Sequence, residues 1–319
     1  MLHVLNGDSA RIGLEQSGIP GEIVVWPDVL YEGPTPLVTG DEWIAARTAH
    51  LTGLSDRLVD DVSARYRSDD AALESFREHD EVVFWFEHDL FDQLLLIRHL
   101  WWMGQRGARS VGGATRFSLV CRDTYLGPAK PDAFPALFAE RRAITEAQIN
   151  LGSQAWITVC GDDPSRLLPF ANSVSPDLPF LRAAMRRFLE DYPSTLNGLS
   201  RTQAQILRVA SGGPLAVGKA FRESAALEEA IFMGDLSFFN IVEALADARQ
   251  PLLAIDERSN DPLSFAEKPI RVTEVGRAVL AGRADHVALN GIDRWMGGVH
   301  LTPERLWRWT GTFVLRAAS

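Results

Sequence analysis

Apolar and polar positions in the first 125 residues form short apolar runs separated by longer segments of helical character. The apolar runs are rich in Val, Ile, Phe and Trp and fall at residues 2–5, 23–26, 82–86 and 117–121. The run 82–86 has no polar position, which is typical of a strand that is covered on both faces. Helical segments are expected after the first run, at 41–79, where Ser68, Asp69 and Asp70 break the pattern, and at 90–103.

Strands separated by helices predict parallel pairing, because each helix carries the chain back to the starting edge of the sheet. We therefore expect an α/β domain with an open, mostly parallel sheet and flanking helices. Residues 140–191 are also predicted to be helical, with Thr145 and Gln148 as a capping box. The segment 155–159 is apolar enough to form a strand instead, and both interpretations stay open.

A second domain is predicted after a cluster of turn-forming residues at 191–198, which gives domains of 1–194 and 195–319. Helical patterns at about 200–212, 215–230 and 235–249 precede two apolar runs, 252–255 and 270–272, that flank a polar loop. Three helices followed by a hairpin is the order of a winged helix. A DNA reader needs basic and amide side chains on its third helix, whereas 235–249 is mostly apolar and acidic.

Composition narrows the partners that can be expected. The chain of 319 residues has 42 acidic and 32 basic side chains, a net charge of −10. The excess of acid lies entirely before residue 195 and opposes non-specific attraction to nucleic acid or anionic lipid. Two cysteines are too few for a disulfide framework or a four-cysteine zinc site. With no secretory signal and no membrane span expected, the predicted location is the cytoplasm.

Polar residues follow each of the four predicted strands. In an open parallel sheet these positions share one edge, where ligands bind beyond the carboxyl ends of the strands. The candidates are Asn6, Gly7, Asp8, Ser9, Asp28, Glu32, Glu87, His88, Asp89, Asp92, Gln93 and Arg122.

Two kinds of chemistry suit this set. Carboxylates held close together either share a proton or bind a hard divalent cation such as Mg²⁺ or Mn²⁺, for which Glu87, Asp89 and Asp92 are the predicted ligands. His88, Asp89 and Asp8 are then the candidates for catalysis. The structural alternative makes Asp8 and Asp89 helix N-caps and His88 a hydrogen-bonded structural residue.

The remaining candidates are expected to surround a small-molecule ligand. Gly7 and the amides that open the first helix suit a phosphate, with Arg11 or Arg122 as its partner. Asp8 would repel that phosphate unless a metal ion bridged the two. The candidate ligand-binding residues are Asn6, Gly7, Ser9, Asp28, Glu32, Gln93 and Arg122.

Three hypotheses for function follow. The first is an enzyme or ligand-binding protein for a small phosphorylated or nucleotide-like metabolite. The second is a ligand-sensing transcription regulator that binds DNA through the C-terminal domain, and the third is a protein-interaction scaffold. No feature of the sequence indicates an oligomeric state.

The segments 2–9, 25–34 and 86–93 together resemble a bacterial family catalogued as domain of unknown function 1835. The similarity covers about the first 130 residues, and the downstream region looks like that of longer members. The resemblance implies an α/β domain and supplies no substrate, cofactor or catalytic residue.

Overall fold

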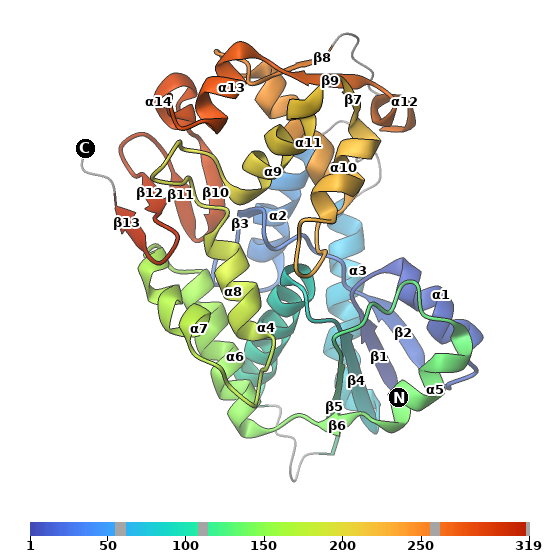
Figure 1. Cartoon of the computed structure of the whole chain (residues 1–319). Coiled ribbons are helices and arrows are strands. Elements are labelled where there is room, and N and C mark those ends of the chain that lie inside the picture. The colour runs from blue at the N-terminus through green and yellow to red at the C-terminus, as the bar shows by residue number, and fades with distance from the viewer. Residues whose placement is uncertain (55–61, 108–113, 256–261, 317–319) are drawn as a thin grey trace. The chain divides into compact units, whose positions relative to one another are not determined.

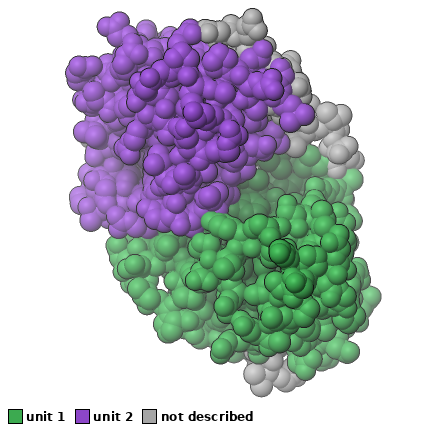
Figure 2. Space-filling model, turned by 45° about the vertical axis from the view of Figure 1, so that its right-hand side comes forward, with its two compact units in different colours: residues 1–185, 296–299 green, residues 186–295, 300–319 purple. Residues whose placement is uncertain are grey.

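The computed structural model describes residues 1–54, 62–107, 114–255 and 262–316. They form two compact units, shown in different colours in Figure 2. Unit 1 comprises residues 1–185 and 296–299, and unit 2 comprises residues 186–295 and 300–319. The sequence pattern places a boundary near residue 195, whereas the units divide after residue 185 and the first unit takes in a late segment of the chain.

Unit 1 is built around a five-stranded sheet of order β2-β1-β4-β5-β6 (Figure 1). Strands β1, β2, β4 and β5 are parallel, and the short edge strand β6 is antiparallel to β5. The predicted α/β architecture with a mostly parallel sheet is confirmed. The strands are β1 (Leu2–Leu5), β2 (Glu22–Val25), β4 (Glu81–Phe86), β5 (Arg116–Cys121) and β6 (Arg142–Ala143).

Helices cover both faces of this sheet, as the unbroken apolar run of β4 predicts. On one face Val83 and Trp85 pack in a buried cluster with residues of α1 (Asp8–Gln16) and α5 (Phe134–Ala139). On the other face Phe84 and Phe86 contact His99 of α4 (Leu90–Gln105), with ring centroids 5.3 and 5.5 Å apart. Every residue of β4 is buried.

The order of the strands creates a switch point between β1 and β4. From β1 the chain crosses to β2 on one side, and it then returns to form β4 on the other side before continuing to β5. Leu5 pairs with Trp85, so the two strands end side by side. In open α/β sheets the loops diverge at this point and leave room for a ligand.

The remaining helices of unit 1 differ from the pattern at several places. Residues 140–191 are not helical throughout, because 142–143 form β6 and 173–180 are irregular. α3 continues through residues 68–70, where a break was expected, and α6 includes 155–159, so the strand interpretation of that segment is wrong. Ile149, Gly152, Ala155, Trp156 and Val159 are buried in α6, at the spacing of one helix face. The helices are α2 (Asp41–Leu54), α3 (Val62–Glu74), η1 (Ser75–Glu78), η2 (Pro131–Ala133), α6 (Glu146–Val159), η3 (Pro164–Leu167), α7 (Leu168–Asn172) and α8 (Leu181–Leu189), whose last residues belong to unit 2.

Unit 1 also contains a pairing between distant parts of the chain. β3 (Gly33–Pro34) pairs in parallel with β10 (Arg294–Gly297), Met296 lying opposite Gly33. Gly298 donates a backbone hydrogen bond to Val159. A Cβ atom built on Gly298 would come within 1.9 Å of the carbonyl oxygen of Cys160, so this close approach requires glycine.

Unit 2 has helices around a small antiparallel sheet of order β7-β9-β8. The apolar side chains of α11 pack with those of α9 in one buried cluster. Residues 256–261 of the predicted polar loop lie outside the described residues. In chain order the elements are α9 (Arg201–Val209), η4 (Ala210–Gly212), β7 (Leu215–Ala216), α10 (Val217–Ala225), α11 (Asp235–Asp247), β8 (Leu253–Ile255), α12 (Pro262–Ala266), β9 (Pro269–Val272), α13 (Glu274–Leu280), α14 (His286–Asn290), β11 (Val299–Leu301), which begins in unit 1, β12 (Trp307–Trp309) and β13 (Val314–Arg316).

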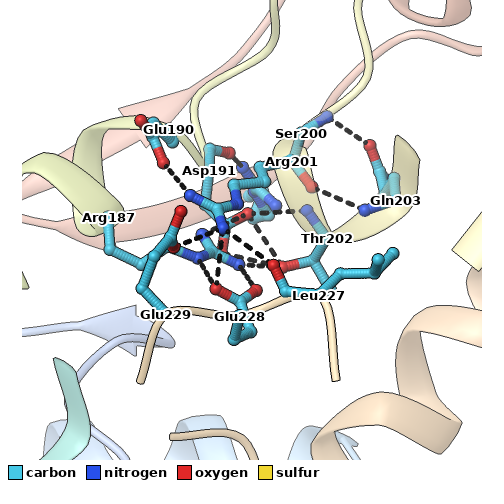
Figure 3. A network of polar contacts seen from close by, with 11 residues as sticks. Arg187, Glu190, Asp191, Ser200, Arg201, Thr202, Gln203, Leu227, Glu228 and Glu229 are labelled. Carbon is cyan, nitrogen blue, oxygen red and sulfur yellow. Dashed lines mark hydrogen bonds and ion pairs between the residues drawn. The ribbon is translucent and has the colours of Figure 1, made fainter. Parts of the chain in front are cut away.

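A network of charged side chains joins three segments of unit 2 (Figure 3). Arg187 donates to both carboxylate oxygens of Glu228, each at 2.8 Å, and to the hydroxyl of Thr202. Thr202 in turn donates to Asp191 at 3.0 Å. The network therefore ties the end of α8 to the start of α9 and to the chain after α10.

None of the helices that the structure describes combines the length and the apolar character needed to cross a bilayer.

Candidate functional site

Three carboxylates gather where β4 leads into α4. Glu87 follows the strand directly, Asp89 is the N-cap of α4, and Asp92 lies in its first turn. All three residues are buried, and one carboxylate oxygen from each lies within 4.8 Å of the others. Oxygen atoms at this spacing suit the coordination shell of one divalent cation. We call Glu87, Asp89 and Asp92 the acidic cluster.

Hydrogen bonds hold the acidic cluster in place from several sides. Asp92 accepts from the amide of Glu87 at 2.9 Å and from Nδ2 of Asn6 at 2.8 Å. Asp89 accepts from the amide of Asp92, which is the N-cap interaction expected from the structural alternative. Glu87 accepts from the amide of Leu126 at 2.7 Å, in the loop that follows β5. The cluster thus lies at the β1–β4 switch point, between the ends of three strands.

Burial makes the negative charge on this cluster unfavourable. It raises the pKa of Asp89 to about 7, and the nearby charge of Glu87 acts in the same direction. The pKa of Asp92 is raised by burial and then by the charges of Asp89 and Glu87. Burial also raises the pKa of Glu87, against hydrogen bonds from Asn6 and from the 126–127 backbone. Such a group either retains protons or binds a cation.

The residues that open α1 form no hydrogen bond or ion pair with the acidic cluster in the part of the chain that the structure describes. The side chain of Asp8 is 59% exposed and forms an ion pair with Arg11 at 3.0 Å, while Ser9 is also exposed. Gly7 has an extended backbone, and a Cβ atom added to it would meet no neighbour within 4 Å. Its conformation therefore does not require glycine, and the adjacent charge of Asp8 disfavours a phosphate at this helix end.

Asp28 and Glu32, the candidates that follow β2, surround a buried arginine. Asp28 and Arg47 are both fully buried as side chains and pair at 2.7 Å. Arg47 also donates to the backbone carbonyls of Glu32 and Val29, at 2.7 and 2.9 Å. Charge-assisted hydrogen bonds of this kind fix the loop and helix α2 together. The structure therefore places Asp28 in a structural ion pair, to which Glu32 adds its backbone carbonyl.

His88, Gln93 and Arg122 lie on the flank of the acidic cluster. The ring of His88 packs against Tyr125 and Phe180, with centroids 5.2 and 5.9 Å apart, and its buried Nδ1 has no hydrogen-bond partner among the described residues. Gln93 donates from Nε2 to the carbonyl of Glu87 at 2.7 Å. Arg122 is half exposed and pairs with Glu140 at 2.5 Å.

Beside the acidic cluster is a pocket of about 210 Å³. Gln93 and Leu96 of α4, Leu119 and Cys121 of β5, and Phe180 contribute to its walls, and Arg122 and Arg142 lie at β5 and β6. Burial raises the pKa of the Cys121 thiol to about 12, so this cysteine is protonated near neutral pH and suits a wall better than a nucleophile.

Sequence reasoning missed several parts of this site. The amide of Leu126, the wall residues Cys121 and Phe180, and the edge residue Arg142 were not among the candidates. The end of β5 was the available signal, since the loop after it was expected to reach the same sheet edge. Phe180 lies in an irregular segment whose fold against β5 has no local sequence signature.

No protein-family model matches the chain, and a search of the curated proteins gives no match. The family resemblance of the three N-terminal segments therefore remains an expectation.

Proposed function

We propose that the protein binds Mg²⁺ or Mn²⁺ on Glu87, Asp89 and Asp92 and uses it to hold a small phosphorylated or nucleotide-like metabolite, as an enzyme or ligand-binding protein. The observation that carries the proposal is the position of three buried carboxylates at the switch point of a parallel sheet. Their mutual repulsion is relieved when a cation binds, and the bound cation attracts the phosphate that the acids alone would repel.

We assign separate chemical roles to the cation, to the carboxylates and to His88. The cation polarises a phosphate oxygen, and the carboxylates fix the cation. His88, next to two of the ligands in the chain and with Nδ1 unpartnered among the described residues, is the group proposed to transfer a proton. The two cysteines, both free thiols, are compatible with the cytoplasmic location that we propose.

Titration of metal-free protein with MnCl₂, followed by calorimetry and by the electron paramagnetic resonance of free Mn²⁺, tests the proposal. We expect one site per chain, and a loss of affinity of at least about tenfold in Asp89→Asn and in Asp92→Asn, because each removes a charged ligand. Asp132→Asn, an exposed acid on η2, is the matched control. Equal Mn²⁺ affinity in wild type and Asp92→Asn would exclude the cation site.

The same carboxylates have a second possible role, which the raised pKa of Asp89 favours. Without a cation, two of them share a proton and act as a general acid or base. In that case the protein releases no protons on addition of MnCl₂, and the titration above shows no heat.

We also propose that unit 2 is a winged-helix domain whose third helix, α11, packs in the core of the domain and does not read DNA. Support comes from the order α9-β7-α10-α11-β8-β9 with a three-stranded antiparallel sheet. DNA binding is not favoured, because the exposed residues of α11 are Asp235, Leu236, Ala244 and Asp247. If unit 2 bound duplex DNA with an affinity that falls steeply as the salt concentration rises, the regulator hypothesis would be favoured instead. A scaffold role would need α11 exposed, whereas its apolar face is buried.

A further inference from the structure

The size of the pocket beside the acidic cluster limits what it can enclose. An apolar cavity of about 150 Å³ is known to accommodate benzene, and drug-sized ligands occupy pockets of about 300 Å³ or more. The pocket measures about 210 Å³. It therefore has room for one ring with a small substituent and does not enclose a whole nucleotide.

The walls offer apolar surface and one directed polar group. Leu96, Leu119, Leu178 and Phe180 supply the apolar surface. Gln93 is 1% exposed, and its Nε2 donates to the carbonyl of Glu87. Its Oε1 accepts no hydrogen bond from any residue in the described part of the chain, so a ligand can donate to it. A buried amide oxygen gains most from such a partner, because leaving it unpaired is costly.

Arginines collect at the outer side of the pocket, in a chain whose net charge is −10. Arg122 is neutralised by Glu140 and Arg141 by Glu81, at 2.5 and 2.9 Å. The guanidinium of Arg142 forms no ion pair or hydrogen bond with a described residue. All three arginines line a second, open hollow of about 520 Å³.

Arg142 lies next to a residue of the pocket wall. It pairs with Leu119 across the antiparallel β5–β6 ladder, and both residues line the pocket. A guanidinium that is free of other partners is suited to bidentate binding of phosphate. Two acids also line the pocket, Glu140 and Asp177, and they disfavour a ligand that carries several anionic groups.

We propose that this pocket binds a ring-bearing phosphate monoester, with the ring between Leu119 and Phe180, a polar group of the ring on Gln93, and the phosphate on Arg142. This deepens the proposed function by naming the substrate class. It rests on the cation site for any reaction. For binding, the cation of the proposed function adds to the attraction of the phosphate, whereas Arg142 and the ring site bind the ester without it. The pocket and the acidic cluster share the segment 87–93, because Gln93 contacts the Glu87 carbonyl and Phe180 contacts His88.

Binding of phenyl phosphate, measured by calorimetry and by saturation-transfer NMR in the presence of EDTA, tests the inference. We expect binding that is at least about tenfold weaker in Arg142→Gln, which removes the charged donor, and in Leu119→Trp, which fills the ring site. Arg166→Gln, an exposed arginine on η3, is the control and should bind like wild type. Inorganic phosphate and phenol should each bind more weakly than phenyl phosphate, because each satisfies one half of the site.

Equal affinity of Arg142→Gln and wild type, or no binding up to about 10 mM, would overturn the inference. Benzoate binding as tightly as phenyl phosphate would overturn the assignment to phosphate esters. The experiments can refute the cation site and the phosphate-ester pocket independently of each other. Loss of the Mn²⁺ site with phenyl phosphate binding intact would refute only the cation site, and an intact Mn²⁺ site without phenyl phosphate binding would refute only the pocket.

Discussion

Asn6 donates from Nδ2 to Oδ2 of Asp92 at 2.8 Å, across 86 positions of the chain. The bond connects the residue that follows β1 with the first turn of α4. It stabilises the charged form of Asp92 and thereby opposes the rise in the pKa of Asp92 that burial causes. It also restricts the carboxylate to one orientation, which is the usual contribution of a group that hydrogen-bonds to a metal ligand.

Removing this amide is expected to weaken the cation site without removing a ligand. Asn6→Ala should reduce the affinity for Mn²⁺ by about tenfold, because outer groups of metal sites typically contribute that much. Calorimetry with metal-free protein measures the change. Asn172→Ala, at an exposed position of α7, is the matched control. An affinity in Asn6→Ala equal to that of the control would show that the Asn6–Asp92 bond has no part in cation binding.

The buried pair of Asp28 and Arg47 is expected to stabilise the fold and to leave the site unaffected. Asp28→Asn leaves the guanidinium of Arg47 buried without its counter-ion, which typically costs about 3–5 kcal/mol in the free energy of unfolding. Urea unfolding measures that loss, and Mn²⁺ affinity at low urea should be unchanged. Asp41→Asn, an exposed acid on α2, should have little effect. If the Asp28→Asn variant were as stable as wild type but bound Mn²⁺ more weakly, Asp28 would belong to the cation site.

The buried histidine of α4 makes stability depend on pH. Burial, and next the charge of Arg98, lower the pKa of His99 to about 3, from about 6.5 in an unfolded chain. As the pH falls below 6.5 the unfolded state takes up a proton that the folded state does not, so stability is lost on acidification. Between pH 7 and 5 this contribution amounts to about 2 kcal/mol.

Urea unfolding at pH 7 and pH 5, compared between wild type and His99→Gln, isolates that contribution. The variant cannot bind the proton, so its free energy of unfolding should change less over this interval. His50, with a pKa lowered to about 4 mainly by burial, adds a change in the same direction in both proteins. Identical pH dependence in the two proteins would contradict the assignment to His99.

The central sheet and the acidic cluster could be predicted because their signals are local. Residues 82–86 are apolar throughout, and Glu87, Asp89 and Asp92 follow within six positions, so one correct strand places all three acids at the sheet edge. Asn6 follows from the rule that parallel strands end at a common edge. The ion pair of Asp28 with Arg47 could not be predicted, because Arg47 in the helical pattern of 41–79 looks like any exposed charge on a helix.

The parts that the pattern missed depend on contacts between distant segments. β3 has two residues, too few for any periodicity, and its partner β10 is about 260 positions away. For 155–159, an apolar run of five residues fits a strand and a helix equally well by itself, and the buried positions 149 and 152 decide for the helix. The pocket depends on the packing of 176–180 against β5, which no local rule predicts.

The charged network of unit 2 yields the last prediction (Figure 3). Arg187 is nearly buried, and its neighbours Asp191 and Glu228 have no more than 14% of their side chains exposed. After burial, which acts in the opposite direction, the charge of Arg187 is the main cause that lowers the pKa of Asp191, so Asp191 keeps its charge at neutral pH. Arg187→Met replaces the guanidinium with an uncharged side chain and removes the counter-ion that Asp191 and Glu228 share, whereas the ion pair of Glu228 with Arg201 at 3.3 Å remains.

We expect Arg187→Met to lose about 3–5 kcal/mol in the free energy of unfolding, measured by urea titration at pH 7. Arg166→Met removes an arginine that is 80% exposed, with its acid 3.9 Å away, and should lose less than about 0.5 kcal/mol. Adding Glu228→Gln to Arg187→Met should recover part of the loss, because it removes one of the two carboxylates that Arg187 paired with. If the double variant is no more stable than Arg187→Met alone, the destabilisation comes from lost packing against Phe232 and not from buried charge.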